Sequence, residues 1–295
     1  MADEWRVQFD AEVTFRNGGR LGAESFRLDI PGEDIADDAL AALFVRHLGL
    51  LMVGEVRIRN KQLLREPHKG SRGVDAPARR RRLVELSHPI SHGMITYPGL
   101  PGPEITDHLS REASRSYYAE GTEFQIGRIS MVANTGTYVD VPSHRFSHGV
   151  DLAGSSLSSL VDLDGLLVRA DARAVDRALL LPHDVRGRAV LIHTDWDRHF
   201  GTDRYVVNAP YLTGDAAAWL AAEGATLVGI DSVNIDDMGD RSRPAHTALL
   251  AAGIPIVEHL RGLDALPPSG FRFHAAPPQV RGMGTFPVRA YAVVS

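Results

Sequence analysis

Apolar and polar residues alternate strictly at the start of the chain. In the stretch WRVQFDAEVTF, apolar side chains occupy every second position, at Val7, Phe9, Ala11, Val13 and Phe15. This period of two is typical of a β-strand with one buried face. A turn is favoured at Asn17-Gly18-Gly19, and the alternation returns over residues 26–30. The first thirty residues are therefore predicted to form a β-hairpin.

The hydrophobic pattern changes to helical spacing after residue 37. Apolar residues then stand at Leu40, Leu43, Phe44 and Leu48. Asp34 or Asp37 is suited to the N-cap of this helix, and Gly49 to its end. Val56 and Ile58, between charged neighbours, predict a further strand. Together these elements predict a small ββαβ module over residues 1–65.

A linker and a larger domain are expected to follow. Residues 66–82, EPHKGSRGVDAPARRRR, lack any hydrophobic period and are rich in glycine, proline and charge, which is typical of a linker. Over residues 83–295, apolar strand-like runs alternate with short helical patterns. The runs cover 166–170, 189–194, 225–231 and 254–260, and the helical patterns cover 215–224 and 244–253. This alternation predicts an α/β domain with a mixed, partly buried sheet.

Composition restricts the chemistry of any metal site. The chain has no cysteine. Disulfides, thiolate ligands and cysteine nucleophiles are thereby excluded, and a metal must be held by histidine and carboxylate side chains. No organic cofactor is expected.

Charge and hydropathy indicate the setting in which the chain works. A formal net charge of −5 argues against a nucleic-acid binder, which usually has a basic face. No apolar run approaches the length of a membrane span, and the start MADEWRVQFD has no apolar signal region. The sequence therefore predicts a cytoplasmic protein with a small-molecule substrate and neither a nucleic-acid nor a membrane partner.

One segment concentrates the polar residues that could carry chemistry. Residues 131–149 read MVANTGTYVDVPSHRFSHG. If residues 132–140 are extended, the side chains of Asn134, Tyr138 and Asp140 project to one face, because strand side chains alternate. Gly136 on that face leaves room for a close approach. His144 follows, after Pro142 ends the strand.

This segment resembles the motif of the cyclase family, which includes the kynurenine formamidases (arylformamidases) and isatin hydrolases. The family motif is His-x-Gly-Thr-His-x-Asp-x-Pro-x-His, and it aligns here with residues 134–144, NTGTYVDVPSH. The stretches LVELSHPISHGMITYPGLPGP, VLIHTDWD, LVGIDSVNID and PAHTALLAAGIPIVEHL resemble further family segments in the same order. The resemblance extends over residues 83–295.

The resemblance implies a swivelling β/β/α fold, one or two divalent metals and a histidine acid/base at His144. It further implies a homodimer or higher homo-oligomer. In dinuclear members the two motif histidines and the motif aspartate hold one metal, and that aspartate, a later histidine and a glutamate hold the other. The first set corresponds here to Asn134, Tyr138 and Asp140, and the second to Asp140, His246 and Glu258.

This chain departs from the family at the first metal position. Asn134 and Tyr138 replace the two motif histidines. An amide carbonyl is a weak, uncharged ligand, and a tyrosine must lose a proton with a pKa near ~10 before it can compete with imidazole. Asp140, His246 and Glu258 still offer a set for one open site, which would accept Zn²⁺, Mn²⁺ or Mg²⁺.

Three functions remain open from the sequence. The first is a hydrolase of an amide, lactam or similar C–N bond, with one metal on Asp140, His246 and Glu258, and His144 as acid/base. The second is a metal-independent cyclase or dehydratase acting on a β-keto or polyketide-like substrate, with proton transfer by Tyr138 and His144. The third is a non-catalytic small-molecule binding protein. In each, Asn134 and Tyr97 are candidate contacts to the small molecule.

The remaining polar residues are assigned to the fold. Asp231 and Asp236 are interpreted as members of an Asx turn, and His88 and His92 as groups that support the site or the fold. The module over residues 1–65 contains no cluster of histidines or carboxylates. It is expected to pack on the catalytic domain, to shield the pocket or to contribute to an oligomer interface.

Overall fold

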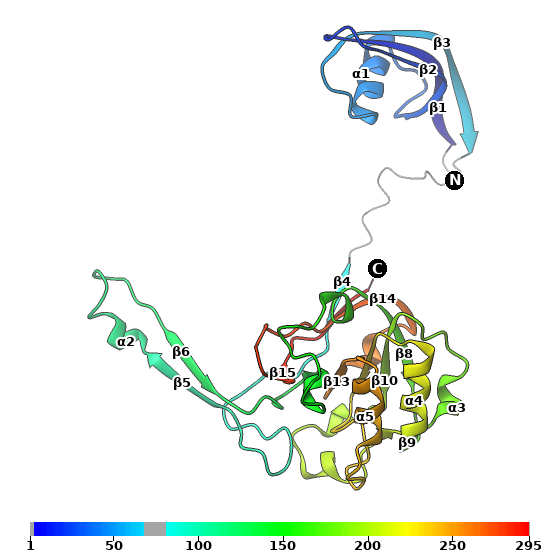
Figure 1. Ribbon diagram of the computed structural model, residues 1–295. Helices are drawn as coiled ribbons and strands as arrows, with labels where there is room; N and C mark the ends of the chain where they lie inside the picture. The colour runs from blue at the N-terminus through cyan, green and yellow to red at the C-terminus, as the bar shows by residue number, and fades with distance from the viewer. Residues whose placement is uncertain (1–2, 68–80, 295) are drawn as a thin grey trace. The chain divides into compact units, whose positions relative to one another are not determined.

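The computed structural model describes residues 3–67 and 81–294 and divides the chain into two compact units, Met1–Pro77 and Ala78–Ser295. Most of the linker predicted over residues 66–82 lies outside the described residues. Figure 1 shows the elements of each unit. Among the described residues, no helix is long and apolar enough to cross a membrane.

The first unit is a three-stranded antiparallel sheet with one helix, in the order ββαβ. Its elements are β1 (Asp3–Phe15), β2 (Arg20–Ile30), α1 (Asp37–His47) and β3 (Val53–Pro67). The sheet has the order β2-β1-β3, so β1 is central. Its alternating apolar residues are buried against α1, where the Phe9 and Phe44 rings meet edge to face at 5.5 Å. The predicted module is confirmed.

The second unit contains a nine-stranded mixed sheet. Its order is β15-β7-β13-β12-β10-β8-β14-β16-β4, in which β13, β12, β10 and β8 run parallel and the other pairs are antiparallel. The strands of this sheet are β4 (Arg82–Glu85), β7 (Tyr138–Asp140), β8 (Leu163–Arg169), β10 (Arg188–His193), β12 (Leu227–Ile230), β13 (Ile256–Glu258), β14 (Ser269–His274), β15 (Thr285–Pro287) and β16 (Tyr291–Val294). The predicted mixed α/β architecture is confirmed.

The remaining elements of this unit are short helices and two small sheets. The helices are α2 (Arg111–Ser114), α3 (Arg177–Leu180), α4 (Gly214–Glu223) and α5 (Pro244–Ala251). The small sheets pair β5 (Glu104–Leu109) with β6 (Ile126–Ser130), and β9 (Ala174–Val175) with β11 (Tyr211–Leu212). Thr213 caps α4 through its hydroxyl, and Pro244 opens α5.

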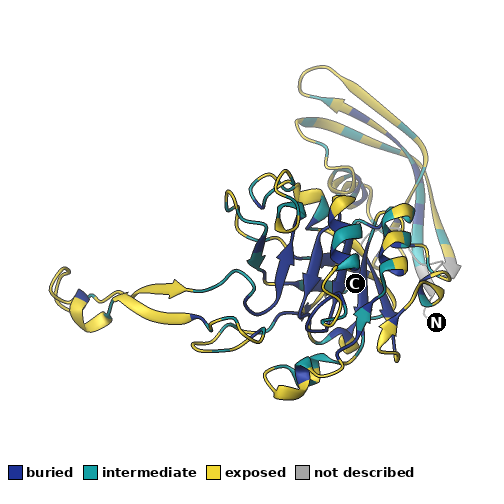
Figure 2. Cartoon of the chain, turned by 60° about the horizontal axis from the view of Figure 1, so that its bottom comes forward, coloured by how far each residue is buried: buried dark blue, intermediate teal, exposed yellow. Residues whose placement is uncertain are grey.

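The large sheet is buried on both faces. On β10, Leu191 belongs to one apolar cluster, whereas its neighbours Val190 and Ile192 belong to another. This alternation follows from the period of two in strand side chains. Helices α4 and α5 contribute Leu220 and Leu249 to the second cluster and thereby cover that face. In Figure 2 the central strands are accordingly dark blue.

The hairpin of β5 and β6 projects from the second unit as an exposed arm. Figures 1 and 2 both show it extending away from the large sheet. Every residue of β6 is exposed, and Ile105 pairs with Ile129 across the hairpin with both side chains accessible to solvent. A two-stranded ribbon has no core of its own.

Candidate active site

Strand pairing at one edge of the large sheet gathers the site. Strand β7 runs antiparallel to both β13 and β15, with Glu258 opposite Tyr138 and Thr285 opposite Asp140. Residues directly opposite in an antiparallel pair have neighbouring side chains. Tyr138 and Asp140 are two residues apart and therefore share one face of β7. The pairing thus brings together the side chains of Tyr138, Asp140, Glu258 and Thr285.

The extended segment predicted over residues 132–140 is shorter in the structure. Strand β7 covers only Tyr138–Asp140. Gly136 has a φ of 65°, and its N–H donates to the Thr96 hydroxyl at 2.7 Å, so the chain turns instead of continuing the strand. The space at Gly136 is taken by the protein itself, since a Cβ there would lie 3.3 Å from Ile90. Asn134 still lines the pocket, from the loop before the strand.

Helix α5 positions His246 above this sheet edge. The backbone N–H groups of Ala245 and His246 donate to the Asp236 carboxylate at 2.6 and 3.1 Å. The same carboxylate accepts from Nδ1 of His246 at 2.7 Å. Asp236 therefore fixes both the helix start and the ring, and it leaves Nε2 of His246 without a proton when the ring is neutral. These bonds differ from the Asx turn expected for Asp236, since the turn acceptor is Asn234, which binds the Asp236 N–H.

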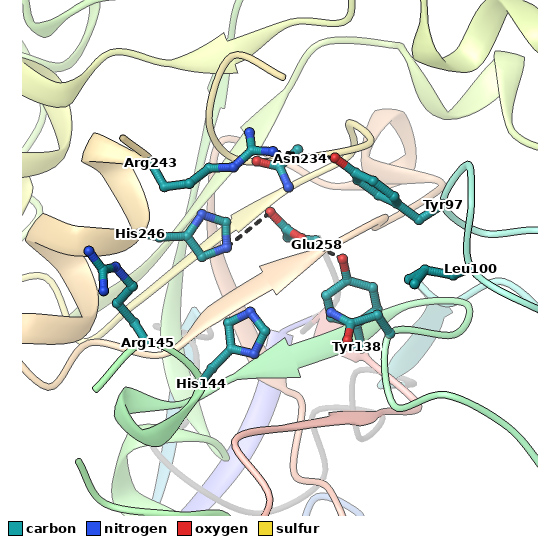
Figure 3. A pocket seen from close by; sticks show the side chains of 10 residues that line it. Tyr97, Leu100, Tyr138, His144, Arg145, Asn234, Arg243, His246 and Glu258 are labelled. Atoms are coloured by element: carbon teal, nitrogen blue, oxygen red, sulfur yellow. Dashed lines mark hydrogen bonds and ion pairs between the residues drawn. The ribbon is translucent and has the colours of Figure 1, made fainter. Parts of the chain in front are cut away.

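Two carboxylates converge on this imidazole nitrogen. Nε2 of His246 lies 3.5 Å from Oδ2 of Asp140 and 3.6 Å from Oε1 of Glu258. All three side chains are buried, and Oδ2 of Asp140 has no hydrogen-bond partner among the residues that the structure describes. Figure 3 shows His246 and Glu258 facing one another across this point. A buried carboxylate oxygen without a donor is costly unless a cation balances it.

The electrostatics of this point favour positive charge. Burial disfavours the charged form of His246, but the carboxylates of Asp140, Asp236 and Glu258 outweigh it and raise the pKa of this imidazole to about 10. Burial raises the pKa of Glu258 to about 7, although His246 acts in the opposite direction. One imidazole nitrogen and two carboxylates suit a divalent cation of the Zn²⁺, Mn²⁺ or Mg²⁺ type. The residues present therefore fit a metal.

His144 lies beside this group on the short turn Pro142–His144. Its Nδ1 is 2.6 Å from the Thr285 hydroxyl and 3.6 Å from Oδ1 of Asp140. Because the Thr285 hydroxyl donates its one proton to Asp140, its oxygen accepts from Nδ1–H of His144. The other ring nitrogen, Nε2, is then the one able to accept a proton. Ligating atoms of Asp140, His144 and His246 all lie within 4.8 Å of one another, so geometry also admits His144 as a ligand.

Gly284 holds the backbone of His144 in place. A Cβ on Gly284 would overlap the backbone N and Cα of His144. We expect Gly284→Ala to displace His144 and to lower the turnover of any substrate of this site by roughly 10²-fold, the effect of about a 1 Å misplacement. Steady-state kinetics will measure this loss. Gly127→Ala, at a strand position with open space, is the matched control and is expected to keep full turnover. Equal rates in both variants would contradict the role of Gly284.

Tyr138 belongs to a buried row of hydrogen bonds that leads to Glu258. Its hydroxyl donates to Oε2 of Glu258 at 2.6 Å and lies 3.3 Å from Nε2 of His259. Nδ1 of His259 is 2.9 Å from the Tyr205 hydroxyl. Since the proton of Tyr138 is directed to Glu258, Nε2–H of His259 donates to Tyr138 and Nδ1 accepts from Tyr205.

Burial keeps the members of this row uncharged. Burial and the nearby carboxylates of Glu258 and Asp140 raise the pKa of Tyr138 well above its ordinary value, although a hydrogen bond from Asn134 acts in the opposite direction. Burial lowers the pKa of His259 to about 3. Tyr138 is thus a protonated phenol that orients Glu258, and Tyr205 and His259 support it.

A pocket of about 280 Å³ opens onto these groups. It is lined by Tyr97, Leu100, Asn134, Tyr138, His144, Arg145, Asn234, Arg243, His246 and Glu258. Six of the seven residues proposed from the sequence line it, and the seventh, Asp140, is buried directly behind His144 and His246. Sequence reasoning missed Arg145, Asn234 and Arg243. The clustering of polar residues between the strand ending at 230 and the helix starting at 244 was the available signal for the last two.

Comparison with known families and structures shows which family this chain belongs to. A family model described as "Putative cyclase" matches residues 84–237, more than half of the sequence. The chain belongs to this family. The resemblance seen in the sequence is therefore confirmed, and with it the expectation of an enzyme of the cyclase family.

The curated relatives include kynurenine formamidases. The protein of that name from Erythrobacter litoralis (strain HTCC2594) is 29% identical over 202 residues, which cover 67% of this chain and 87% of the relative. A kynurenine formamidase from Bacillus cereus (strain ATCC 14579) is 24% identical over 208 residues, which cover 70% and 95%.

Solved structures share the fold of this cyclase-family chain. Isatin hydrolase A from Ralstonia solanacearum superposes with a TM-score of 0.63 at 23% identity and covers 73% of this chain and 92% of its own. A structure described as a potential metal-dependent hydrolase with cyclase activity superposes with a TM-score of 0.60 at 25% identity, covering 73% and 98%. The predicted swivelling cyclase-like fold is confirmed.

Proposed function

We propose that this cyclase-family enzyme hydrolyses the C–N bond of an amide, lactam or similar group in a small molecule, with one divalent metal and His144 as acid/base. The observation that carries the proposal is the convergence of Nε2 of His246, the unpartnered Oδ2 of Asp140 and Oε1 of Glu258 at the base of the pocket. The names of the relatives, kynurenine formamidase and isatin hydrolase, support a hydrolase of this type.

Asp140, His246 and Glu258 would hold the metal, Zn²⁺, Mn²⁺ or Mg²⁺. When bound, such an ion polarises a substrate carbonyl and lowers the pKa of water. Asp236 fixes the His246 ring, and the N–H of Ile235 donates to Oε1 of Glu258 at 2.6 Å. The metal ligands are thus pre-oriented by groups behind them.

His144 moves the protons of the reaction. Its Nδ1–H is held by Thr285, so Nε2 is free to take a proton from the attacking water and to return it to the leaving nitrogen. Asn134 and Tyr97 line the same pocket and contact the substrate. Tyr138 donates to Glu258 and acts through that carboxylate.

Chelation followed by metal addition tests the proposal. Exhaustive chelation of the full chain is expected to remove its hydrolysis of formanilide, an arylformamide, and Mn²⁺ or Zn²⁺ is expected to restore it. The release of formate and aniline gives the rate. Undiminished hydrolysis by protein that elemental analysis shows to be free of metal would overturn the role of the ion.

The second candidate function is that of a metal-independent cyclase or dehydratase, which would act on a β-keto or polyketide-like substrate by proton transfer. The row from Tyr205 through His259 to Tyr138 favours it, because such a row carries hydrogen-bond polarisation to a phenol at the pocket. Because the chain is an enzyme of the cyclase family, the non-catalytic binding protein considered from the sequence is no longer a candidate.

Tyr138→Phe separates the first two candidates. We expect the variant to keep its metal and to lose less than about tenfold in amide hydrolysis, because the phenol only supports Glu258. A Tyr138 that acts as general acid would instead cost roughly 10²–10⁴ in rate. Steady-state kinetics with formanilide measures the difference. Tyr211→Phe, at a half-buried tyrosine outside the pocket lining, is the matched control.

A further inference from the structure

Arg243 is held at the pocket by two uncharged acceptors. Its Nη1 donates to the backbone oxygen of Asp237 at 3.1 Å, and its Nη2 donates to the Tyr97 hydroxyl at 3.4 Å. A guanidinium has five N–H donors. The other three have no acceptor among the described residues. Figure 3 shows the side chain reaching over His246 toward Tyr97.

The charge of Arg243 is not balanced by an ion pair. No carboxylate of the described residues lies within ion-pair distance of its guanidinium. Asp240, in the preceding turn, is exposed and accepts from the backbone and hydroxyl of Ser242, and its charge interacts with that of Arg243 only from beyond ion-pair distance. A half-buried arginine whose role was only structural would be expected to pair with a carboxylate.

The backbone of Arg243 is in an unfavourable conformation. It has a φ of 53° and a ψ of 59°, in the left-handed region, directly before Pro244 at the start of α5. Residues other than glycine and asparagine adopt this region at a cost, and such positions cluster at functional sites.

The rest of the pocket complements a cation at this position. Arg145, which follows His144, also lines the pocket; it is exposed, its guanidinium lies 5.4 Å from the centre of the Phe146 ring, and no described residue forms an ion pair with it. Tyr97 and Leu100 provide an aromatic and an apolar surface. The pocket therefore combines two guanidinium groups that form no ion pair among the described residues with a wall suited to a ring or an alkyl chain.

We propose that Arg243, assisted by Arg145, binds a carboxylate on the substrate, so that the enzyme acts on amides of acidic, ring-bearing molecules. That the reacting group is an amide rests on the proposed hydrolase function. The anion subsite itself depends only on the pocket. Two parallel N–H groups of a guanidinium match the two oxygens of a carboxylate, and such charge-assisted bonds are stronger than neutral ones.

Binding of reaction products tests the subsite without turnover. Calorimetry on the metal-loaded full chain compares aniline with the ortho, meta and para isomers of aminobenzoate, which differ from aniline by one carboxylate. At least one isomer is expected to bind roughly tenfold to a hundredfold tighter than aniline. In Arg243→Asn this preference is expected to vanish, and asparagine tolerates the left-handed backbone. Arg241→Gln, at an exposed arginine outside the pocket lining, is expected to keep it.

Arg243→Lys is a second, more conservative variant, which keeps the test valid if Arg243→Asn fails to fold. It keeps the charge but loses the planar fork, so the preference is expected to fall several-fold and not to vanish. The proposal is overturned if no isomer binds tighter than aniline, or if the preference survives in Arg243→Asn, as it would if the carboxylate bound the metal. Hydrolysis of formanilide and its carboxylated analogues is measured in parallel. A binding preference without any hydrolysis would refute the proposed function and leave the subsite standing.

Discussion

Replacing Asp140 with asparagine is expected to abolish metal binding and to lower amide hydrolysis by about 10³-fold or more, the several kcal/mol that a metal supplies to a transition state. Asparagine keeps the shape of the side chain and its acceptor for Thr285. It replaces the unpartnered Oδ2 with an amide group that donates toward Nε2 of His246. The metal position then loses one of its two carboxylates and gains a competing donor.

Stability gives this prediction a second readout. Without metal, Asp140→Asn is expected to unfold at a lower temperature than the unmodified protein, because the buried His246 imidazole, whose pKa is raised to about 10, loses one of the carboxylates that balance its charge. Mn²⁺ at a hundredfold excess over its Kd should raise the free energy of unfolding of the unmodified protein by about 2.7 kcal/mol and leave the variant unchanged. Calorimetric melting with and without Mn²⁺, together with elemental analysis, measures both effects.

Asp171→Asn is the matched control, since Asp171 is exposed and outside the pocket lining. It is expected to bind metal and to hydrolyse formanilide as the unmodified protein does. An Asp140→Asn protein that retained one metal per chain and full activity would show that the ion is held elsewhere.

Hydrophobic periodicity was sufficient to predict the α/β class and many of the strands, because burial of one face fixes the period of an element, whereas the swivelling cyclase-like fold followed from the family resemblance. The alternation from Val7 to Phe15 became β1, and the apolar runs near residues 190, 228 and 256 became neighbouring strands of one sheet. The extended segment at 132–137 failed because a single glycine decided the local backbone. Gly136 turns there to bond Thr96, a contact of 40 residues' separation that no local pattern contains.

The site was predictable where it follows a motif and not where it follows pairing between distant segments. Asp140, His144, His246 and Glu258 stand at motif positions in the sequence. Asp236 was read as a local turn, yet its carboxylate reaches the helix start and the His246 ring. Arg243 was missed because an arginine before a helix proline is unremarkable until the structure shows that it lines the pocket and has no described carboxylate within ion-pair distance.

The substitution of tyrosine for a motif histidine can be understood through its neighbours. Tyr138 lies opposite Glu258 on paired strands, so its hydroxyl meets that carboxylate directly. His259, the next residue after Glu258, has a φ of 56° that turns its ring back toward the same hydroxyl. A phenol bonded on both sides therefore stands where the family motif has a histidine, and it orients the glutamate that we propose as a metal ligand.

We expect His144→Gln and Glu258→Gln to distinguish residues that bind the metal from the residue that transfers protons. Glu258→Gln removes a carboxylate from the metal position, so we expect its metal content to fall to background together with its activity. His144→Gln removes the acid/base, so we expect it to retain one metal per chain while hydrolysis falls by roughly 10²–10⁴. Elemental analysis and single-turnover rates on the same preparations give both quantities.

The opposite pattern would reassign the site, because the geometry admits a second ligand set. Atoms of Asp140, His144 and His246 lie within 4.8 Å of one another, and Glu258 contacts His246 from the other side. His144 is 35% exposed and held by Thr285, as suits a group that exchanges protons with the pocket, whereas Glu258 is almost fully buried. Loss of metal in His144→Gln with retention in Glu258→Gln would make His144 a ligand, and the proton-transferring group would then have to be sought among the other residues of the pocket.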